Sequence, residues 1–230
     1  MQHSRRARPL IIAIDGPSGA GKGTVARELA RLLNYRHLDT GAMYRAVAWK
    51  ALKDGVSLQD EDAVATVADR AALEIGPTRV VIDGHEVTSA IRTPEIDRAA
   101  TATARLPKVR EVLVRRQREA GEGGGIVIEG RDIGSVVFPN ADVKIYLDAS
   151  PEERARRRAS DPAHGLSRAA AVADVGSEMA ERDRSDRTRS TSPLTVAADA
   201  VELDTTRLSV HETVQEVLAI VKRVLVDSPP

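Results

Sequence analysis

The sequence predicts an α/β fold in which a five-stranded parallel sheet carries helices on both faces. Short apolar runs alternate along the chain with segments of helical periodicity. This alternation is typical of a parallel sheet, because each crossover between parallel strands needs a helix. Hydrophobic residues make up 42% of the 230 residues and aromatic residues only 2%, so we expect a core of Ala, Val, Leu and Ile. The expected buried strands are 10–14, 36–39, 126–129, 143–147 and 200–204.

The other elements follow from local patterns, taken in order. Residues 1–8 are basic and should form a disordered tail, and the apolar run after them is too short for a signal peptide or a membrane span. A helix should follow the first strand, where apolar residues recur at helical spacing. Residues 73–91 contain two turn signals between apolar runs, which predicts a small antiparallel meander in an inserted subdomain, 60–105. The chain should close with an amphipathic helix over 210–226.

Composition excludes several classes of protein. Acidic and basic residues number 34 each, so the formal net charge is zero, which argues against a general nucleic-acid-binding protein. The chain has no cysteine, which excludes disulfides and thiolate metal sites and fits a reducing cytosol. Its five histidines show no metal-ligand spacing. We therefore expect a cytoplasmic protein whose partners include neither a nucleic acid nor a membrane.

The strongest motif, GPSGAGKGT, comes directly after the first expected strand. Gly16, Gly21 and Lys22 have the G-x-x-x-x-G-K spacing of a phosphate-binding loop. The glycines allow positive φ angles and a close approach of the backbone to a ligand. Backbone N–H groups then converge on phosphate oxygens where the next helix begins, and Lys22 would reach the β- and γ-phosphates. A glycine-rich turn without a ligand is the alternative, but strand, lysine and following helix all favour phosphate binding.

The residue after this lysine is Gly23 rather than Ser or Thr, and the hydroxyl comes one place later, at Thr24. We therefore expect Mg²⁺ to be bound largely by ATP and water, with no direct protein ligand. The loop alone does not define a function. The chain lacks the N-K-x-D motif of a GTPase, and Leu147-Asp148 only partly matches the Asp-Glu at which a motor ATPase strand ends.

Two more strand ends carry polar residues at the edge where open α/β sheets place their sites. The second strand leads into LDTGAMYR, where Thr40 and Arg45 would lie near this edge. A helix cap followed by a surface arginine is the alternative. The third strand leads into EGRDIG, where Arg131 and Asp132 follow an apolar run. Here the alternative is a structural ion pair at the end of the strand.

An arginine-rich segment late in the chain, ERDRSDRTR, contains four arginines and three acids. On a helix, Arg182, Asp186 and Arg189 share one face, and such a face could grip an anionic ligand. Asp183 and Arg187 could form an ordinary surface pair, which stabilises an exposed helix by about 0.2–0.5 kcal/mol. A disordered tract that folds on RNA is the rival interpretation, and the alternating acids argue against it.

Together these motifs resemble those of the bacterial cytidylate kinases, in the P-loop nucleoside monophosphate kinase superfamily. The matching segments run in order from about residue 10 to residue 225: GPSGAGKGT, LDTGAMYR, IRT, PKVREVLVRRQR, GRDIG, VKIYLDAS and ERDRSDRTR. The resemblance implies a three-layer P-loop NTPase fold with a β-rich monophosphate-binding insert and an Arg-rich lid. It also implies a monomer that phosphorylates CMP and dCMP to CDP and dCDP by in-line transfer from ATP, in pyrimidine nucleotide metabolism.

The resemblance divides the chain into a tail, a core, an insert and a lid. The core should comprise 9–59, 106–153 and 193–230, behind the tail 1–8; the insert should be 60–105 and the lid 154–192. The lid should close over both nucleotides and exclude water. Pro162, Gly165 and Gly176 break the helical pattern within the lid and should act as hinges.

This reaction needs charge neutralisation more than a general base, because the acceptor phosphate is already an anion. At about 4 Å and an effective dielectric constant near 20, a charge pair contributes roughly 4 kcal/mol. By resemblance, the residues expected to act on the transferring group are Lys22, Arg131, Arg157, Arg182 and Arg189. Those expected to bind ATP are Gly16, Pro17, Ser18, Gly19, Ala20, Gly21, Lys22, Gly23, Thr24 and Arg158.

The resemblance also implies a binding site for CMP or dCMP. Its expected residues are Thr40, Tyr44, Arg45, Thr101, Arg110, Arg131, Asp132, Arg182, Asp186 and Arg189. Cytosine offers an amine donor, for which Asp132 is suited, and the acceptors N3 and O2, which Arg110 and Thr101 would serve. Without the resemblance, Arg110 could equally be a surface charge, because the arginines that follow it are solvated.

Within ERDRSDRTR, the resemblance assigns Arg182 and Asp186 to the sugar of CMP and Arg189 to its phosphate. The other charged residues of the segment should be solvated. Two other functions are weighed against this one: a kinase for another monophosphate or small metabolite, and an ATP-binding regulator without catalysis. The β-rich insert and GRDIG argue against the first, and a second phosphate site argues against the second. Residues 204–206, after the last strand, would lie near the adenine.

Overall fold

The computed structural model describes residues 9–161 and 172–227 of the chain. Its main sheet is parallel and has five strands in the order β2-β6-β1-β7-β8. The strands are β1 (Ile11–Asp15), β2 (Arg36–Asp39), β6 (Ile126–Glu129), β7 (Val143–Asp148) and β8 (Val201–Asp204). The five predicted strands are confirmed, with ends that differ by at most one residue. Because β1 is central, the loop after it leaves from the middle of the carboxyl edge.

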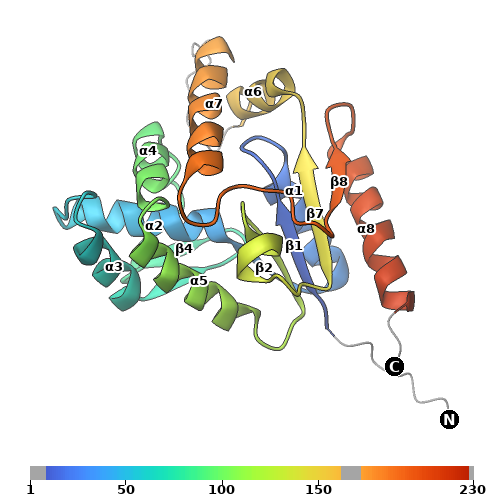
Figure 1. The fold of residues 1–230 in the computed structure, drawn as a ribbon, viewed down its shortest axis with the longest axis horizontal. Coiled ribbons are helices and arrows are strands. Elements are labelled where there is room, and N and C mark those ends of the chain that lie inside the picture. The colour runs from blue at the N-terminus through green and yellow to red at the C-terminus, as the bar shows by residue number, and fades with distance from the viewer. Residues whose placement is uncertain (1–8, 162–171, 228–230) are drawn as a thin grey trace.

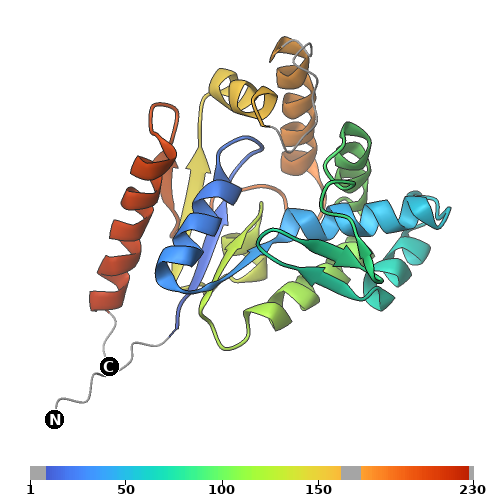
Figure 2. The same cartoon turned by 180° about the vertical axis from the view of Figure 1, so that it is seen from behind.

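Successive residues of β1 point to opposite faces of the sheet and contribute to two cores. Ile12 and Ile14 pack with α1 (Lys22–Leu33) and α8 (Val210–Asp227), whereas Ala13 packs with α2 (Thr40–Lys53) and α5 (Pro107–Gly121). Figures 1 and 2 show these helical layers from opposite sides. Because both faces are covered, the central strands β1 (IIAID) and β6 (IVIE) are apolar except at their last residue. Among the described residues, no helix is long and apolar enough to cross a membrane.

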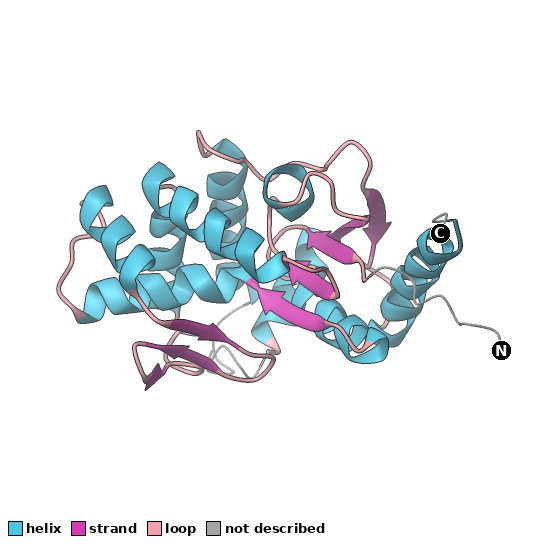
Figure 3. Cartoon of the chain, turned by 90° about the horizontal axis from the view of Figure 1, so that it is seen from below, coloured by secondary structure: helices cyan, strands magenta, loops and turns pink. Residues whose placement is uncertain are grey.

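The segment between α2 and α5 contains α3 (Glu61–Arg70), a three-stranded antiparallel sheet and α4 (Pro94–Thr103). The small sheet consists of β3 (Leu73–Ile75), β4 (Val80–Ile82) and β5 (His85–Glu86), which confirms the predicted meander. Its second turn has positive φ angles at Asp83 (47°) and Gly84 (74°), as an Asp-Gly hairpin requires. The small sheet packs against α2 and lies apart from the main sheet in Figure 3.

Two helices, α6 (Pro151–Ala159) and α7 (Val172–Thr188), stand beyond the carboxyl edge of the main sheet (Figure 1). The prediction that Gly176 breaks the helix as a hinge is wrong, because Gly176 lies inside α7. A Cβ there would lie 3.6 Å from the Cβ of Ala155, so this position is where α7 packs on α6. The other predicted hinges, Pro162 and Gly165, and the predicted tail lie outside the described residues.

Candidate active site

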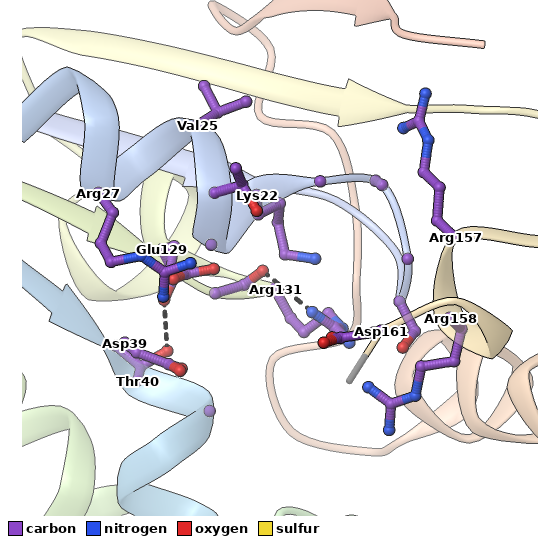
Figure 4. A pocket seen from close by; sticks show the side chains of 18 of the residues that line it. Lys22, Val25, Arg27, Asp39, Thr40, Glu129, Arg131, Arg157, Arg158 and Asp161 are labelled. Atoms are coloured by element: carbon purple, nitrogen blue, oxygen red, sulfur yellow. Dashed lines mark hydrogen bonds between the residues drawn. The ribbon is translucent and has the colours of Figure 1, made fainter. Parts of the chain in front are cut away.

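The carboxyl edge of the main sheet borders a cavity of about 850 Å³. The loop after β1, the ends of β2 and β6, and the arginines of α6 meet around it (Figure 4). The arginines of α7 also line it. Gly16 and Pro17, at the base of the loop, do not line it. The predicted site residues that do are Ser18, Gly19, Ala20, Gly21, Lys22, Gly23, Thr24, Thr40, Tyr44, Arg45, Thr101, Arg110, Arg131, Asp132, Arg157, Arg158, Arg182, Asp186 and Arg189.

The loop after β1 has the backbone geometry that its glycines predict. Gly16, Gly19 and Gly21 all have positive φ angles, and α1 begins at Lys22. A Cβ at Gly16 would overlap the carbonyl oxygen of Leu147, so a side chain is excluded there. The Nζ of Lys22 donates to the Pro17 carbonyl at 2.6 Å, inside the loop. Burial, and then the charge of Arg131, lower the pKa of Lys22 to about 7, so a phosphate beside it would restore its charge.

The end of β2 joins a helix cap to a buried cation. Asp39 Oδ1 accepts the N–H of Ala42 at 2.9 Å and so caps α2, and Oδ2 lies 3.1 Å from Nη2 of Arg45. Arg45 is only 8% exposed and lines the cavity, so it is not the surface arginine of the alternative interpretation. Thr40 donates its hydroxyl to the Glu129 carbonyl at 2.7 Å, which fastens the start of α2 to β6.

Asp132 and Arg131 do not pair with each other but with residues from other segments. Asp132 forms an ion pair with Arg110 and another, at 3.2 Å, with Nη2 of Arg189. Arg110 is 2% exposed, so the interpretation of this residue as a surface charge is wrong. The Nε of Arg131 donates to Asp186 Oδ2 at 2.9 Å. Although burial opposes the charge of Arg131, Asp186 and other nearby carboxylates raise its pKa.

Asp97 connects α4 to both helices beyond the sheet. Its carboxylate forms an ion pair with Arg158 of α6 and lies 3.2 Å from Nη1 of Arg182 of α7. Thr101, one turn further along α4, donates its hydroxyl to the Asp97 carbonyl at 2.8 Å. Burial, and then the charge of Arg131, lower the pKa of Arg182 to about 10. A further anion near these arginines would therefore be stabilised.

Arg157 lies at the other end of the cavity. Its Nη1 donates to Thr205 Oγ1 at 2.9 Å and its Nη2 to the Thr205 carbonyl at 2.6 Å, while its Nε contacts Glu153 at 2.8 Å. Arg157 and Arg158 leave α6 at adjacent positions and point in different directions in Figure 4. One helix thus supplies cations to two parts of the cavity.

Sequence reasoning missed Glu129 and Asp97, which border the site without belonging to the residues assigned to it. Glu129 Oε1 lies 3.0 Å from Nε2 of His37, and a Cβ at Gly23 would come within 3.1 Å of the same oxygen. A polar residue at the end of a buried strand beside β1 is the signal that could have found Glu129. No local pattern marks Asp97, because its partners lie on other helices.

Asp183, which we expected to be solvated, is instead 5% exposed. It accepts the N–H of Ser18 at 3.2 Å and forms an ion pair with Arg154 of α6. Arg154 also donates to the Ser18 carbonyl at 3.1 Å. The surface prediction is wrong because these partners come from distant parts of the chain. Asp183 ties α6 and α7 to the phosphate-binding loop.

Replacing Asp183 by alanine should lower the free energy of unfolding by about 3–5 kcal/mol, because it removes the nearest carboxylate of the buried Arg154 guanidinium and leaves only Asp148, at 3.9 Å. Urea denaturation of the nucleotide-free protein measures this. The matched control is Asp69→Ala, which removes the exposed pair between Asp69 and Arg115 and should cost less than about 1 kcal/mol. Similar losses for both variants would contradict the structural role of the buried pair.

Comparison with known proteins identifies the family. The family model described as cytidylate kinase matches residues 12–223. A cytidylate kinase of Solibacter usitatus is 46% identical over 223 residues, covering 94% of both chains. One of Geobacillus kaustophilus is 47% identical over 219 residues, covering 93% of this chain and 97% of that one. A gluconokinase structure from Sinorhizobium meliloti, 16% identical with a TM-score of 0.50 over 96% of this chain and 95% of that one, shows likeness of fold. The chain belongs to the cytidylate kinase family, whose members phosphorylate CMP to CDP with ATP.

Proposed function

We propose that the protein phosphorylates dCMP as well as CMP in this cavity, within pyrimidine nucleotide metabolism. We also propose that the cationic side chains of the cavity hold the phosphates of ATP and of the monophosphate. The observation that carries the proposal is the convergence of cationic side chains from separate segments on one cavity. They include Lys22, Arg45, Arg131, Arg157, Arg158, Arg182 and Arg189. Transfer of a phosphoryl group between two polyanions is accelerated mainly by positioning of the reactants and by positive charges that are already in place before the reaction. No general base is needed, since the acceptor oxygen already carries charge.

On the ATP side, the N–H groups of residues 19–24 and the Lys22 ammonium would bind the β- and γ-phosphates. Lys22 now donates to Pro17 inside the loop, so it is held close to where these phosphates would lie. Arg157 and Arg158 would add charge from α6. Thr205 and neighbouring residues line the end of the cavity beside Arg157, where the adenine would be accommodated.

Mg²⁺ would arrive with ATP and neutralise phosphate charge. The described residues contain no group of three or more His, Cys, Asp or Glu side chains that could hold a metal. Mg²⁺ on a nucleotide keeps several waters and needs few protein ligands. Thr24 and the Glu129 carboxylate, beside the loop at Gly23, are the residues that would meet such waters.

On the CMP side, Asp132 would accept a hydrogen bond from the amine of cytosine, and Arg110 and Thr101 would serve its acceptors. The ion pairs of Asp132 with Arg110 and Arg189 support this role, because two guanidinium groups hold the buried side chain of Asp132 in one position. The remaining wall of this half of the cavity contains Thr40, Tyr44 and Arg45.

The sugar would be bound by Asp186 and Arg182. Burial opposes the charge of Asp186, but Arg131 and then Arg182 lower its pKa, so it can accept hydrogen bonds from sugar hydroxyls. Deoxyribose lacks only the 2′-hydroxyl, and a hydrogen bond to a charged group contributes about 1.5–3 kcal/mol. Loss of one such bond lowers affinity about 10- to 100-fold and leaves every other contact in place, so dCMP should be used as well as CMP.

We also propose that residues 154–192 act as a lid. α6 and α7 contact the loop through Arg154 and Asp183 and supply Arg157, Arg158 and Arg182 to the cavity, so phosphate binding would hold these helices against the loop. Closure would exclude water and prevent wasteful hydrolysis of ATP.

Hydrogen exchange tests these assignments together. A non-hydrolysable ATP analogue alone should slow amide exchange in residues 16–24 and in α6, and CMP alone should slow it in residues 130–134 and α4. Both ligands together should further protect α7, while residues 214–226 of α8, which do not line the cavity, should not change. Equal protection of α6 and α7 with and without nucleotides would rule out the lid. If CMP alone slowed exchange in residues 16–24 but not in residues 130–134, the proposed ATP and CMP sites would have to be exchanged.

A further inference from the structure

Asp15 is a buried carboxylate to which the functional assignment gives no role. It is the last residue of β1, directly before Gly16, and is 6% exposed. It does not line the cavity. Its Oδ1 accepts the N–H of Ile133 at 2.8 Å and its Oδ2 accepts the N–H of Gly134 at 2.7 Å. Both carboxylate oxygens are thus used to hold one short backbone segment.

That segment is the first turn of a π-helix, η1 (Ile133–Val137), which begins directly after Asp132. The side chain of Asp132 does not cap it and pairs instead with Arg110 and Arg189. The first N–H groups of a helix have no acceptor within the helix. Asp15 supplies acceptors for two of them, and π-helical turns are frequent at functional sites.

The contact has little room to shift. A Cβ at Gly134 would lie 3.1 Å from Cδ of Lys144 and 3.4 Å from Oδ2 of Asp15, so the backbone is held between two side chains. Burial raises the pKa of Asp15 to about 6, opposed by the two backbone hydrogen bonds. At neutral pH the carboxylate is therefore ionised and both oxygens can accept.

The position of Asp132 follows from this arrangement. Its backbone lies one residue before the first N–H that Asp15 holds, and its side chain is held by two arginines. β1 is the central strand of the sheet and also carries the phosphate-binding loop. The end of β1 therefore leads into the phosphate-binding loop. Through the side chain of Asp15 it also holds the backbone next to Asp132, which would accept a hydrogen bond from the cytosine amine.

We propose that Asp15 is a positioning residue that fixes Asp132 and so determines discrimination between cytosine and uracil. The proposal rests on the cytosine-binding role proposed for Asp132. Uracil carries an oxygen where cytosine carries the amine, and a carboxylate held opposite that oxygen disfavours UMP. If Asp132 can move, this penalty falls and the contact with CMP weakens, while the loop that binds ATP is unaffected.

The test is Asp15→Asn, which keeps the shape but replaces one acceptor oxygen with an N–H donor that faces a backbone N–H. We expect KM for CMP to rise about tenfold or more and the CMP/UMP ratio of kcat/KM to fall by at least tenfold, with KM for ATP changed less than threefold. The matched control is Asp142→Asn: Asp142 Oδ2 accepts the N–H of Ile11 at 2.8 Å at the opposite end of β1, and this variant should keep the wild-type ratio.

Asp132→Asn, measured in the same assay, separates failure of this inference from failure of the proposed function. If Asp132→Asn lowers the CMP/UMP ratio and Asp15→Asn does not, the positioning role is wrong and the role of Asp132 stands. If Asp132→Asn leaves the ratio unchanged, both roles are wrong. Equal increases in KM for ATP and CMP in Asp15→Asn would show a general structural role instead. If Asp15→Asn does not fold, Gly134→Ala, which crowds the same contact, should lower the ratio, and an unchanged ratio would overturn the proposal.

Discussion

Replacing Lys22 by methionine is expected to lower kcat about 10²- to 10³-fold. Removal of one preorganised group that stabilises transition-state charge typically has this effect. Methionine fills a similar volume in the buried loop but cannot place a positive charge beside the β- and γ-phosphates, and it loses the bond to the Pro17 carbonyl. Steady-state release of ADP with saturating CMP and ATP measures the change, and circular dichroism checks that the fold is kept.

The control for this prediction is a lysine of the same chain outside the site. Lys108 is exposed, and its Nζ lies 2.5 Å from Oδ1 of Asp62. Lys108→Met should leave kcat within twofold of wild type. A loss of less than tenfold in Lys22→Met would contradict the proposed role of the lysine in transfer.

Asp132→Asn should reduce kcat/KM for CMP about 10- to 100-fold and change the affinity for ATP less than threefold. A hydrogen bond to a charged group contributes about 1.5–3 kcal/mol, which corresponds to this range. Asparagine can also turn its side-chain amide NH2 toward the amine of cytosine, and two hydrogen-bond donors would then face each other. The ion pairs with Arg110 and Arg189 are weakened, but asparagine still offers them an oxygen, so the buried arginines keep an acceptor.

Initial rates with varied CMP, together with calorimetric titration of an ATP analogue, test this prediction. Asp69→Asn is a suitable control, since Asp69 pairs with Arg115 at the surface, away from the cavity. Equal losses for ATP and CMP in Asp132→Asn would show that the residue holds the fold of the whole site and does not contact cytosine.

The fold was predictable because its signals are local. Apolar runs define the strands, the spacing of Gly16, Gly21 and Lys22 defines the loop, and Asp83-Gly84 defines a hairpin turn that the structure contains. The prediction of a hinge at Gly176 was wrong because the conformation there depends on a contact between separate segments. A glycine weakens a helix locally, but packing against α6 decides the conformation there.

The site was predictable where polar residues follow strands in recognisable motifs. Asp15, Asp97 and Asp183 could not be found in this way, because their roles depend on contacts between distant segments. Asp183 is separated by 165 residues from Ser18, whose N–H it binds, and no periodicity along α7 distinguishes it from the exposed charges around it. The burial of Arg110 likewise follows from its pairing with Asp132 across the cavity.

The most direct test of the account is release of ADP by the purified chain with ATP and Mg²⁺, with CMP, dCMP, UMP, AMP and GMP each offered separately. We predict rapid turnover of CMP, turnover of dCMP within about 100-fold of it, and slower turnover of the other three than of dCMP. Turnover of another monophosphate at a rate equal to that of CMP would contradict the base-binding roles of Asp132 and Arg110. Absence of turnover with every monophosphate, in a protein that still binds ATP, would contradict the catalytic role of the cavity itself.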